Sequence, residues 1–341
     1  MTEPFILSDS GLLESYCAPK WLRGGNAQTI FPYFINLRPV IGYRRERWEM
    51  DDGDFIDIDW LDGEPDKPLV IMLHGLEGSS RSHYALSLMN FLQILRWRGA
   101  VVHFRGCSGA PNRLPRAYHA GDSVEIDRIL RYIRHQNSPS EWNPACYVVG
   151  VSLGGNALLK WLGEQGAQAV GRVAGVVAVS VPLDLAAAGN VLDLGFNRVY
   201  TRHFLATLKR KALEKNKQFP GLLNAKAIAA CNSLYEFDNL VTAPLHGFRD
   251  TDDYWRQSSS KPWLGSVQVP TLLINARNDP FLPESVLPQK YEISSFVSLE
   301  FPQQGGHVGF MQGAFPGKLD WLPRRIVEFF SSLGGPGAIP E

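Results

Sequence analysis

The segment CYVVGVSLGG, residues 146–155, joins a strand pattern to a helix pattern through a glycine-rich turn. Its first half, CYVVG (146–150), is short, apolar and β-branched, which favours a strand buried on both faces. The segment NALLKWLGE (156–164) has a helical pattern. Between them, residues 150–154 match G-x-S-x-G, whose glycines let a strand turn sharply into a helix with a strained serine at the turn. Ser152 is therefore a candidate nucleophile, and the alternative is a small residue in a glycine-rich packing turn.

The rest of the chain repeats this alternation of strand and helix patterns. Short apolar runs predict further buried strands at LVIMLH (69–74), GAVVHF (99–104), VAGVVAVSV (173–181), TLLINA (271–276) and 297–301. Helical patterns occupy 84–98, 122–134 and 156–164, and one apolar face of the second comprises Ile126, Ile129, Leu130 and Ile133. Such alternation predicts a mostly parallel sheet with helices on both faces, which binds ligands beyond the carboxyl ends of its strands.

Two segments are expected at the margins of this sheet. Residues 43–50 and 55–60 surround the turn Asp51-Asp52-Gly53 and predict a hairpin at a sheet edge. In that hairpin FIDIDW (55–60) alternates apolar with polar residues, as a half-buried strand does. A final amphipathic helix near 321–333 is expected to close the sheet before a tail rich in glycine and proline.

The strand pattern is interrupted in the second half of the chain. From 182 to about 263 the sequence is helical and polar without strands, and the strand pattern resumes at Val269. We therefore predict a single α/β domain whose core comprises residues 1–182 and 267–341, with a helical cap insertion at about 183–266. The length of 341 residues suits one large core that carries an insertion.

Composition narrows the class of partner and the compartment. The chain has 34 Lys+Arg and 34 Asp+Glu, so no net field draws it to nucleic acid or anionic membrane, and a small-molecule partner is favoured. Four cysteines show neither CxxC pairs nor the density of a disulfide scaffold. Residues 1–16 lack a signal-peptide pattern, and the longest apolar run, 173–183, is too short to span a bilayer. We expect a cytoplasmic protein without a transmembrane segment, with peripheral membrane contact and oligomeric state left open.

A serine hydroxyl needs a base, and the base needs an acid to orient it, both later in the chain for this architecture. Asp279, in ARNDPFLP, directly follows the strand 271–276, and His307, in QQGGHVGF, lies in a glycine-flanked loop after the last strand. Asp184, after the preceding strand, is the rival acid. Among the other histidines, His74 is expected to fix loop geometry, and the rest do not suit the required order.

The reaction also needs donors for the negative charge that develops on the attacked carbonyl oxygen. The loop HGLEG (74–78) directly follows a strand and resembles an oxyanion loop. The expected donors are the backbone N–H groups of Leu76 and Leu153. We expect Glu77 to face solvent or pair with an arginine. Cys107 is expected to pack, because no base is assigned to it.

We expect a structural role for Arg105, and the basic and apolar residues of the cap each have two possible roles. Arg105 is expected to brace neighbouring loops through hydrogen bonds. The basic cap residues are expected on a solvated helix face, with contact to anionic head groups as the alternative: Arg198, Arg202, Lys209, Arg210, Lys211, Lys215 and Lys217. Apolar cap residues could roof an acyl pocket or join the cap to the core: Phe196, Tyr200, Phe204 and Leu205.

Six blocks of this sequence resemble the YheT-like family of α/β-hydrolases, whose eukaryotic relatives include abhydrolase-domain lipases and esterases. The blocks are WLRGGNAQTIFP (21–32), HGLEGSSRSHY (74–84), HFRGCSGAPNRLPRAYHAGD (103–122), GVSLGGN (150–156), FDNLVTAPLHGF (237–248) and GGHVGF (305–310). The resemblance covers nearly the whole chain, and it implies the α/β-hydrolase fold and a triad of Ser152, Asp279 and His307. It also implies hydrolysis of carboxylic esters, which range in the family from short esters to lipids.

Taken together, these patterns predict a serine esterase that needs no metal or organic cofactor. The substrate is expected to be a small-molecule ester, with a lipid left open. Two alternatives use the same triad: an alcohol O-acyltransferase and a thioesterase. An alternative of another class is a non-catalytic lipid-binding protein.

Overall fold

The computed structural model describes residues 16–34, 39–136 and 145–334. Its centre is an eight-stranded sheet with the strand order β1-β2-β4-β3-β5-β6-β7-β8. The strands are β1 Arg44–Glu49, β2 Phe55–Leu61, β3 Leu69–Leu73, β4 Arg98–His103, β5 Cys146–Val151, β6 Gly175–Val179, β7 Thr271–Ile274 and β8 Val297–Glu300. Strands β3 to β8 pair in parallel, and β1 and β2 form an antiparallel hairpin at one edge. The predicted mostly parallel sheet is confirmed.

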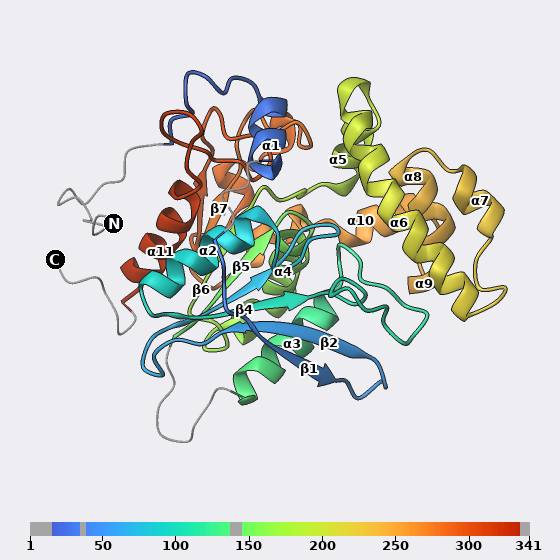
Figure 1. Ribbon diagram of the computed structural model, residues 1–341, viewed down its shortest axis with the longest axis horizontal. Helices are drawn as coiled ribbons and strands as arrows, with labels where there is room; N and C mark the ends of the chain where they lie inside the picture. The colour runs from blue at the N-terminus through green and yellow to red at the C-terminus, as the bar shows by residue number, and fades with distance from the viewer. Residues whose placement is uncertain (1–15, 35–38, 137–144, 335–341) are drawn as a thin grey trace.

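Helices cover both faces of the sheet because successive residues of each buried strand point to opposite sides. On one face Val70 and Met72 share a core with α2 (His83–Ile94) and α11 (Trp321–Ser332). On the other face Ile71 and Leu73 share a core with α3 (Ser123–Gln136) and α4 (Leu153–Gln165). Figure 1 shows α2 and α11 together on their side of the sheet. The four apolar residues predicted on one face of α3 are all buried: Ile126, Ile129, Leu130 and Ile133.

Strand β2 differs from the prediction. The alternation in FIDIDW predicts a strand with one face in water, but every residue of β2 is buried. The reason lies in β1, where Arg47 pairs with Asp57 at 2.8 Å and Arg45 pairs with Asp59 at 2.7 Å. The two arginine side chains are partly exposed, and their guanidinium groups lie over the carboxylates of Asp57 and Asp59. The arginines therefore cover the polar face of β2 and bury it.

Helix α2 ends earlier than its pattern predicts. The periodicity extends over 84–98, whereas the helix ends at Ile94 and β4 already begins at Arg98. Arg96 adopts φ 57°, a left-handed conformation that cannot continue a right-handed helix. The chain uses this residue to reverse direction and enter the sheet.

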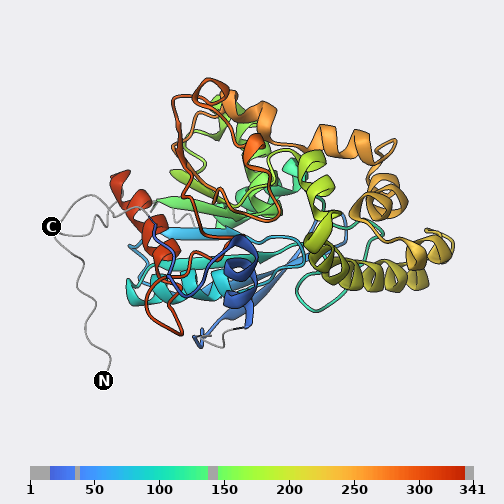
Figure 2. The same cartoon turned by 90° about the horizontal axis from the view of Figure 1, so that it is seen from above.

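The elements between β6 and β7 are all helical, and we refer to this segment as the cap. Its elements are α5 Leu185–Leu192, the 3-10 helix Gly195–Asn197, α6 Arg198–Gln218, α7 Ala225–Ala230, α8 Leu234–Phe237, the π-helix Asp238–Thr242, α9 Ala243–His246, α10 Thr251–Ser258 and the 3-10 helix Lys261–Ser266. Cap residues form their own buried cluster, which also includes Phe281 and Leu282 from the loop after β7. The cap helices extend to one side of the sheet in both views (Figures 1 and 2).

Two predictions lie partly outside the described residues. The signal-peptide question concerns residues 1–16, of which 1–15 are not described, and the glycine- and proline-rich tail falls largely in 335–341. The closing helix predicted near 321–333 is observed as α11. Within the described ranges, no helix is both long enough and apolar enough to cross a membrane.

Candidate active site

Ser152 lies at the sharp turn between β5 and α4. Its backbone is strained, with φ 51° and ψ −121°, and its N–H donates to the carbonyl oxygen of Val179 at 2.8 Å. The turn is tight because glycine allows it: a Cβ on Gly154 would lie 2.5 Å from the carbonyl oxygen of His74. A Cβ on Gly150 would lie 2.6 Å from the Cα of Gly155. The serine is therefore held at the carboxyl edge of the sheet by the local backbone.

The structure brings Ser152, His307 and Asp279 together from three separate loops. The Nε2 atom of His307 lies 3.1 Å from the Oγ of Ser152, and its Nδ1 lies 2.8 Å from the Oδ2 of Asp279. The Asp279 side chain is fully buried and that of His307 is 11% exposed. A neutral imidazole with its proton on Nδ1 donates to the carboxylate and leaves Nε2 free to accept from the serine hydroxyl.

Neighbouring groups fix the orientation of this histidine and aspartate. The ring of Phe281 stacks on the imidazole of His307, with 4.2 Å between centroids and 28° between planes. The N–H of Phe281 also donates to the Oδ1 of Asp279 at 2.8 Å, while Oδ2 faces the imidazole. One residue therefore restrains both partners of the pair.

Helix α1 (Gly25–Phe34) holds the loop that carries His307. The N–H of His307 donates to the Oγ1 of Thr29 at 2.8 Å, and the N–H of Gly305 donates to the Oε1 of Gln28 at 2.9 Å. The side chain of Asn278 also donates to Gln28 Oε1 at 2.9 Å, so the same glutamine joins the loops of both Asp279 and His307. Figure 1 shows α1 beside the orange loops that follow β7 and β8. The sequence interpretation missed these roles, although block 21–32 was the available signal.

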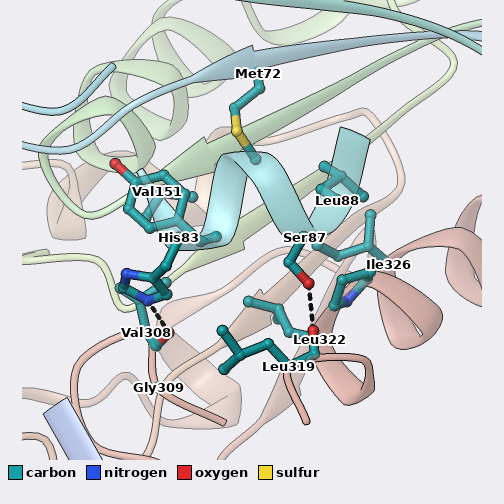
Figure 3. A pocket seen from close by; sticks show the side chains of 12 residues that line it. Met72, His83, Ser87, Leu88, Val151, Val308, Gly309, Leu319, Leu322 and Ile326 are labelled. Carbon is teal, nitrogen blue, oxygen red and sulfur yellow. Dashed lines mark hydrogen bonds between the residues drawn. The ribbon is translucent and has the colours of Figure 1, made fainter. Parts of the chain in front are cut away.

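Helix α2 also contacts the loop that carries His307. The Nε2 atom of His83 lies 3.0 Å from the carbonyl oxygen of Val308, and Ser87 donates to the carbonyl oxygen of Leu319 (Figure 3). The cavity between these residues has a volume of only about 10 Å³, which is too small for a substrate. It is a packing gap under the loop.

The two predicted oxyanion donors border the same cavity as Ser152. Within the described part of the chain, neither the N–H of Leu76 nor that of Leu153 donates a hydrogen bond. Gly75 packs directly on the serine, since a Cβ there would lie 3.1 Å from the Cβ of Ser152. The N–H of Gly75 is occupied by the hydroxyl oxygen of Tyr84 at 3.0 Å. The N–H groups of Leu76, in the HGLEG loop, and of Leu153, at the start of α4, therefore have no acceptor among the described residues.

His74 holds the start of the HGLEG loop. Burial lowers the pKa of this histidine to about 3, so its imidazole is neutral. Its Nε2 accepts from the N–H of Phe104 at 3.1 Å, which places the ring proton on Nδ1, where it donates to the carbonyl oxygen of Gly75 at 2.7 Å. The ring thereby ties two loops together at the edge of the sheet.

A cavity of about 1230 Å³ opens over Ser152 between the core and the cap. Tyr200 and Phe204 from α6 line it, whereas Leu205 packs inside the cap and Phe196 is 55% exposed. Of the four apolar cap residues, Tyr200 and Phe204 therefore face the cavity, Leu205 belongs to the buried cluster of the cap, and Phe196 lies at the surface. The volume exceeds that of most drug-sized ligand pockets.

Comparison with known proteins identifies the family of this chain. A protein-family model for the alpha/beta hydrolase fold matches residues 68–314. The chain is 36% identical over 312 residues to the Escherichia coli (strain K12) protein named "Putative esterase YheT", with 89% of each chain covered. The chain belongs to the alpha/beta hydrolase family.

Two further proteins are similar to this hydrolase at lower sequence identity. It is 27% identical over 330 residues to the human protein named "Phospholipase ABHD3", with 94% of this chain and 79% of the relative covered. Among solved structures, the esterase Pf2001 of Pyrococcus furiosus matches with a TM-score of 0.55 at 17% identity, covering 86% of this chain and 93% of that chain. This structural likeness supports the fold alone.

The remaining candidate residues of the hydrolase have structural partners. Asp184 caps α5, with its Oδ1 accepting from the N–H of Ala187, while the carboxylate against His307 is that of Asp279. Arg105 is buried, and it pairs with Asp54 at 2.8 Å and with Glu125 at 2.6 Å. Among the described residues, no group of three or more His, Cys, Asp or Glu side chains is placed to hold a metal ion.

Glu77 departs from the prediction made for it. It neither faces solvent nor pairs with an arginine: its side chain is 9% exposed and pairs with Lys211 of the cap. Two other basic residues of the cap also form hydrogen bonds to backbone carbonyl groups. Lys215 donates to the carbonyl oxygen of Asn112, at 2.6 Å, and Lys209 to that of Ala229, at 3.0 Å. Lys211 and Lys215 therefore anchor α6 to the core, whereas Lys209 bonds to α7 within the cap.

Proposed function

We propose that this hydrolase cleaves carboxylic esters through an acyl-enzyme, with Ser152 as nucleophile, His307 as general base and acid, and Asp279 as the group that orients the histidine. The observation that carries the proposal is the continuous hydrogen-bonded path from Asp279 through His307 to Ser152. Family membership supports it, because relatives of the chain are named as an esterase and a phospholipase. The strained turn at Ser152 gives the nucleophile the setting that this chemistry uses.

The first half of the reaction forms the acyl-enzyme. The Oγ of Ser152 attacks the ester carbonyl carbon while Nε2 of His307 takes the hydroxyl proton. The carbonyl oxygen becomes an oxyanion that accepts hydrogen bonds from the N–H groups of Leu76 and Leu153. When the tetrahedral intermediate collapses, the bond to the leaving alkoxide breaks and His307 returns the proton to it, releasing an alcohol. Asp279 stabilises the imidazolium in between.

The second half regenerates the enzyme. His307 takes a proton from a water molecule, whose oxygen attacks the acyl carbon. Collapse of this second intermediate breaks the bond to the serine oxygen, His307 returns the proton to Ser152, and a carboxylic acid leaves. The chain's own residues supply every proton transfer in this scheme.

The cavity supports an ester with a substantial apolar acyl group. Its volume of about 1230 Å³ and its lining by Tyr200, Phe204 and Phe281 suit a lipid-like chain. We propose that the cap, at about 183–266, roofs this acyl pocket. The phospholipase among the relatives agrees with a lipid-like substrate.

Labelling with a fluorophosphonate probe tests the nucleophile. The purified protein is expected to be labelled, and Ser152→Ala is expected to lose the label and the hydrolysis of p-nitrophenyl esters together. Labelling that persists in Ser152→Ala would place the nucleophile elsewhere, and no labelling of the wild type would favour a lipid-binding protein. Added alcohol separates hydrolysis from acyl transfer, since hydrolysis yields the free acid as the main product.

A further inference from the structure

An ion pair joins the cap directly to the HGLEG loop, which carries Leu76, one of the two proposed oxyanion donors. The Nζ of Lys211, on cap helix α6, lies 2.8 Å from both carboxylate oxygens of Glu77 in the HGLEG loop. The side chains are 31% and 9% exposed, and both residues line the cavity above Ser152. This contact spans 134 residues of sequence. It is therefore a tertiary connection between two parts of the molecule that enclose the substrate.

Glu77 adopts a backbone conformation that needs support. Its φ of 55° lies in the left-handed region, which is strained for a residue with a side chain. The residue directly precedes Gly78 and follows Leu76, whose N–H is the proposed oxyanion donor. Because Leu76 and Glu77 share a peptide bond, rotation at Glu77 changes the path of the loop that carries this N–H.

Tyr118 closes a small hydrogen-bonded ring around Glu77. Its hydroxyl oxygen accepts from the N–H of Glu77 at 2.9 Å, and the hydroxyl donates to Oε1 of the same residue at 2.8 Å. The phenol ring is stacked on Phe104, with 5.4 Å between centroids and 12° between planes. The left-handed backbone of Glu77 is thus fixed through its own carboxylate, which must point toward Tyr118.

Lys211 supplies the charge that keeps this carboxylate in place. A carboxylate that is nine-tenths buried is costly without a cation, and removing one partner of such a pair is strongly destabilising for the other. The ammonium group is also 3.5 Å from the Sγ of Cys107. Because the ammonium group of Lys211 contacts both carboxylate oxygens of Glu77, the carboxylate balances its positive charge, which is not left for an anionic part of the substrate.

We propose that Lys211 is a positioning residue, which acts through Glu77 to hold the Leu76 N–H where the oxyanion forms. The inference rests on the proposed function, because it takes Leu76 as an oxyanion donor. Its consequence is that the oxyanion hole is complete only when cap helix α6 is seated on the core. Cap closure and transition-state stabilisation are then coupled through one ion pair.

Steady-state kinetics with a neutral ester, such as p-nitrophenyl butyrate, tests this role. Lys211→Met is expected to lower kcat about 10-fold or more, up to the roughly 10²–10³-fold effect of losing one oxyanion donor, and to change KM less than about threefold. Lys211→Arg keeps the ion pair and should restore kcat to within a few-fold of wild type. Lys217→Met is the matched control, because Lys217 is an exposed lysine on the same helix. Wild-type kcat in Lys211→Met would overturn the proposal.

A second variant, Glu77→Gln, keeps the test decisive if Lys211→Met folds poorly, because it breaks the same ion pair without a change at Lys211 and is expected to lower kcat by a similar factor. Glu77→Gln has nearly the same shape and retains an oxygen for Tyr118, but it removes the charge. The double variant Glu77→Gln/Lys211→Met should be about as slow as the slower single variant, because both changes break one unit. Losses that multiply independently would contradict a shared role.

A competing role for Lys211, direct binding of an anionic substrate, predicts a different pattern. An ester of the same acyl length with a terminal carboxylate would then show a raised KM in Lys211→Met, with unchanged kcat and unchanged kinetics for the neutral ester. That result would overturn positioning while leaving the proposed function intact. Full activity of Ser152→Ala would instead overturn the proposed function itself, so the two failures are distinguishable.

Discussion

The imidazole of His307 lies 3.1 Å from the hydroxyl of Ser152, although 155 residues separate them in the chain. Parallel strands create this proximity, because β5 and β8 end at the same edge of the sheet and each is followed by a loop on that edge. Between them β7 ends at the loop of Asp279. The site is therefore assembled by sheet topology, and each loop contributes one group.

Asp279→Asn is expected to lower kcat about 10³–10⁴-fold while leaving the fold intact. An amide at this position can donate to Nδ1 of His307, which favours the tautomer with its proton on Nε2 and blocks acceptance from Ser152. Steady-state kinetics with a p-nitrophenyl ester measures the effect. Asp184→Asn is the control: it should retain activity. Comparable losses in both variants would contradict the assignment of Asp279.

The sequence predicted those parts of the site that depend on local pattern. A strand, a glycine turn and a helix identify Ser152 from residues within ten positions, and chain order then suggests Asp279 and His307. The support from α1 was not predictable in this way, because Gln28 and Thr29 act on loops more than 250 residues away. No local pattern distinguishes a glutamine that joins two loops from one that faces water.

The errors on β2 and on the cap lysines share a physical cause, which is pairing across the fold. Period-2 alternation correctly predicts that β2 is a strand, but it cannot reveal that Arg45 and Arg47 of the neighbouring strand cover the polar face. Likewise, a basic stretch on a helix indicates a solvated face until a buried acid such as Glu77 is known to lie opposite. In both cases the sequence interpretation missed the charge partner because it comes from another element of the fold.

Thr29→Val is expected to lower kcat about 10-fold and to reduce the free energy of unfolding by about 1 kcal/mol. Valine has the shape of threonine but leaves the N–H of His307 without its acceptor, so the histidine loop loses a fixed point. Thr29→Ser keeps the hydroxyl and should remain near wild type in both measurements. Urea unfolding and ester kinetics together test this, and a valine variant equal to wild type would show that α1 does not position the loop.

Gly154→Ala is expected to destabilise the protein, even though alanine normally favours a helix over glycine by about 1 kcal/mol. The new methyl group would lie 2.5 Å from the carbonyl oxygen of His74, a backbone atom that cannot move without shifting the HGLEG loop. We expect a net loss of about 1–3 kcal/mol in the free energy of unfolding, with reduced kcat. Gly42→Ala is the control, since nothing lies within 4 Å of its added Cβ. Equal stability of the two variants would contradict the close approach.

Asp238→Asn is expected to remove part of the pH dependence of stability. Burial raises the pKa of Asp238 to about 6, against the effect of hydrogen bonds from Thr242 and Trp255. Because the pKa is higher in the folded state, the contribution of this group to stability is fully present below about pH 4. It declines as the pH rises to about 6, by up to about 3 kcal/mol.

Urea unfolding at pH 4.5, 5.5, 6.5 and 7.5 measures this contribution as the difference between the wild type and Asp238→Asn. The variant loses one acceptor, so its stability is expected to be offset from the wild type, but the offset should change in its favour as the pH rises because the wild type alone must ionise a buried carboxyl. Asp66→Asn, at an exposed aspartate, gives the baseline for removing a carboxylate in water. An offset that stays constant from pH 4.5 to 7.5 would mean that Asp238 titrates in the folded protein as it does in the unfolded chain, and that burial among cap residues imposes no cost on its charge.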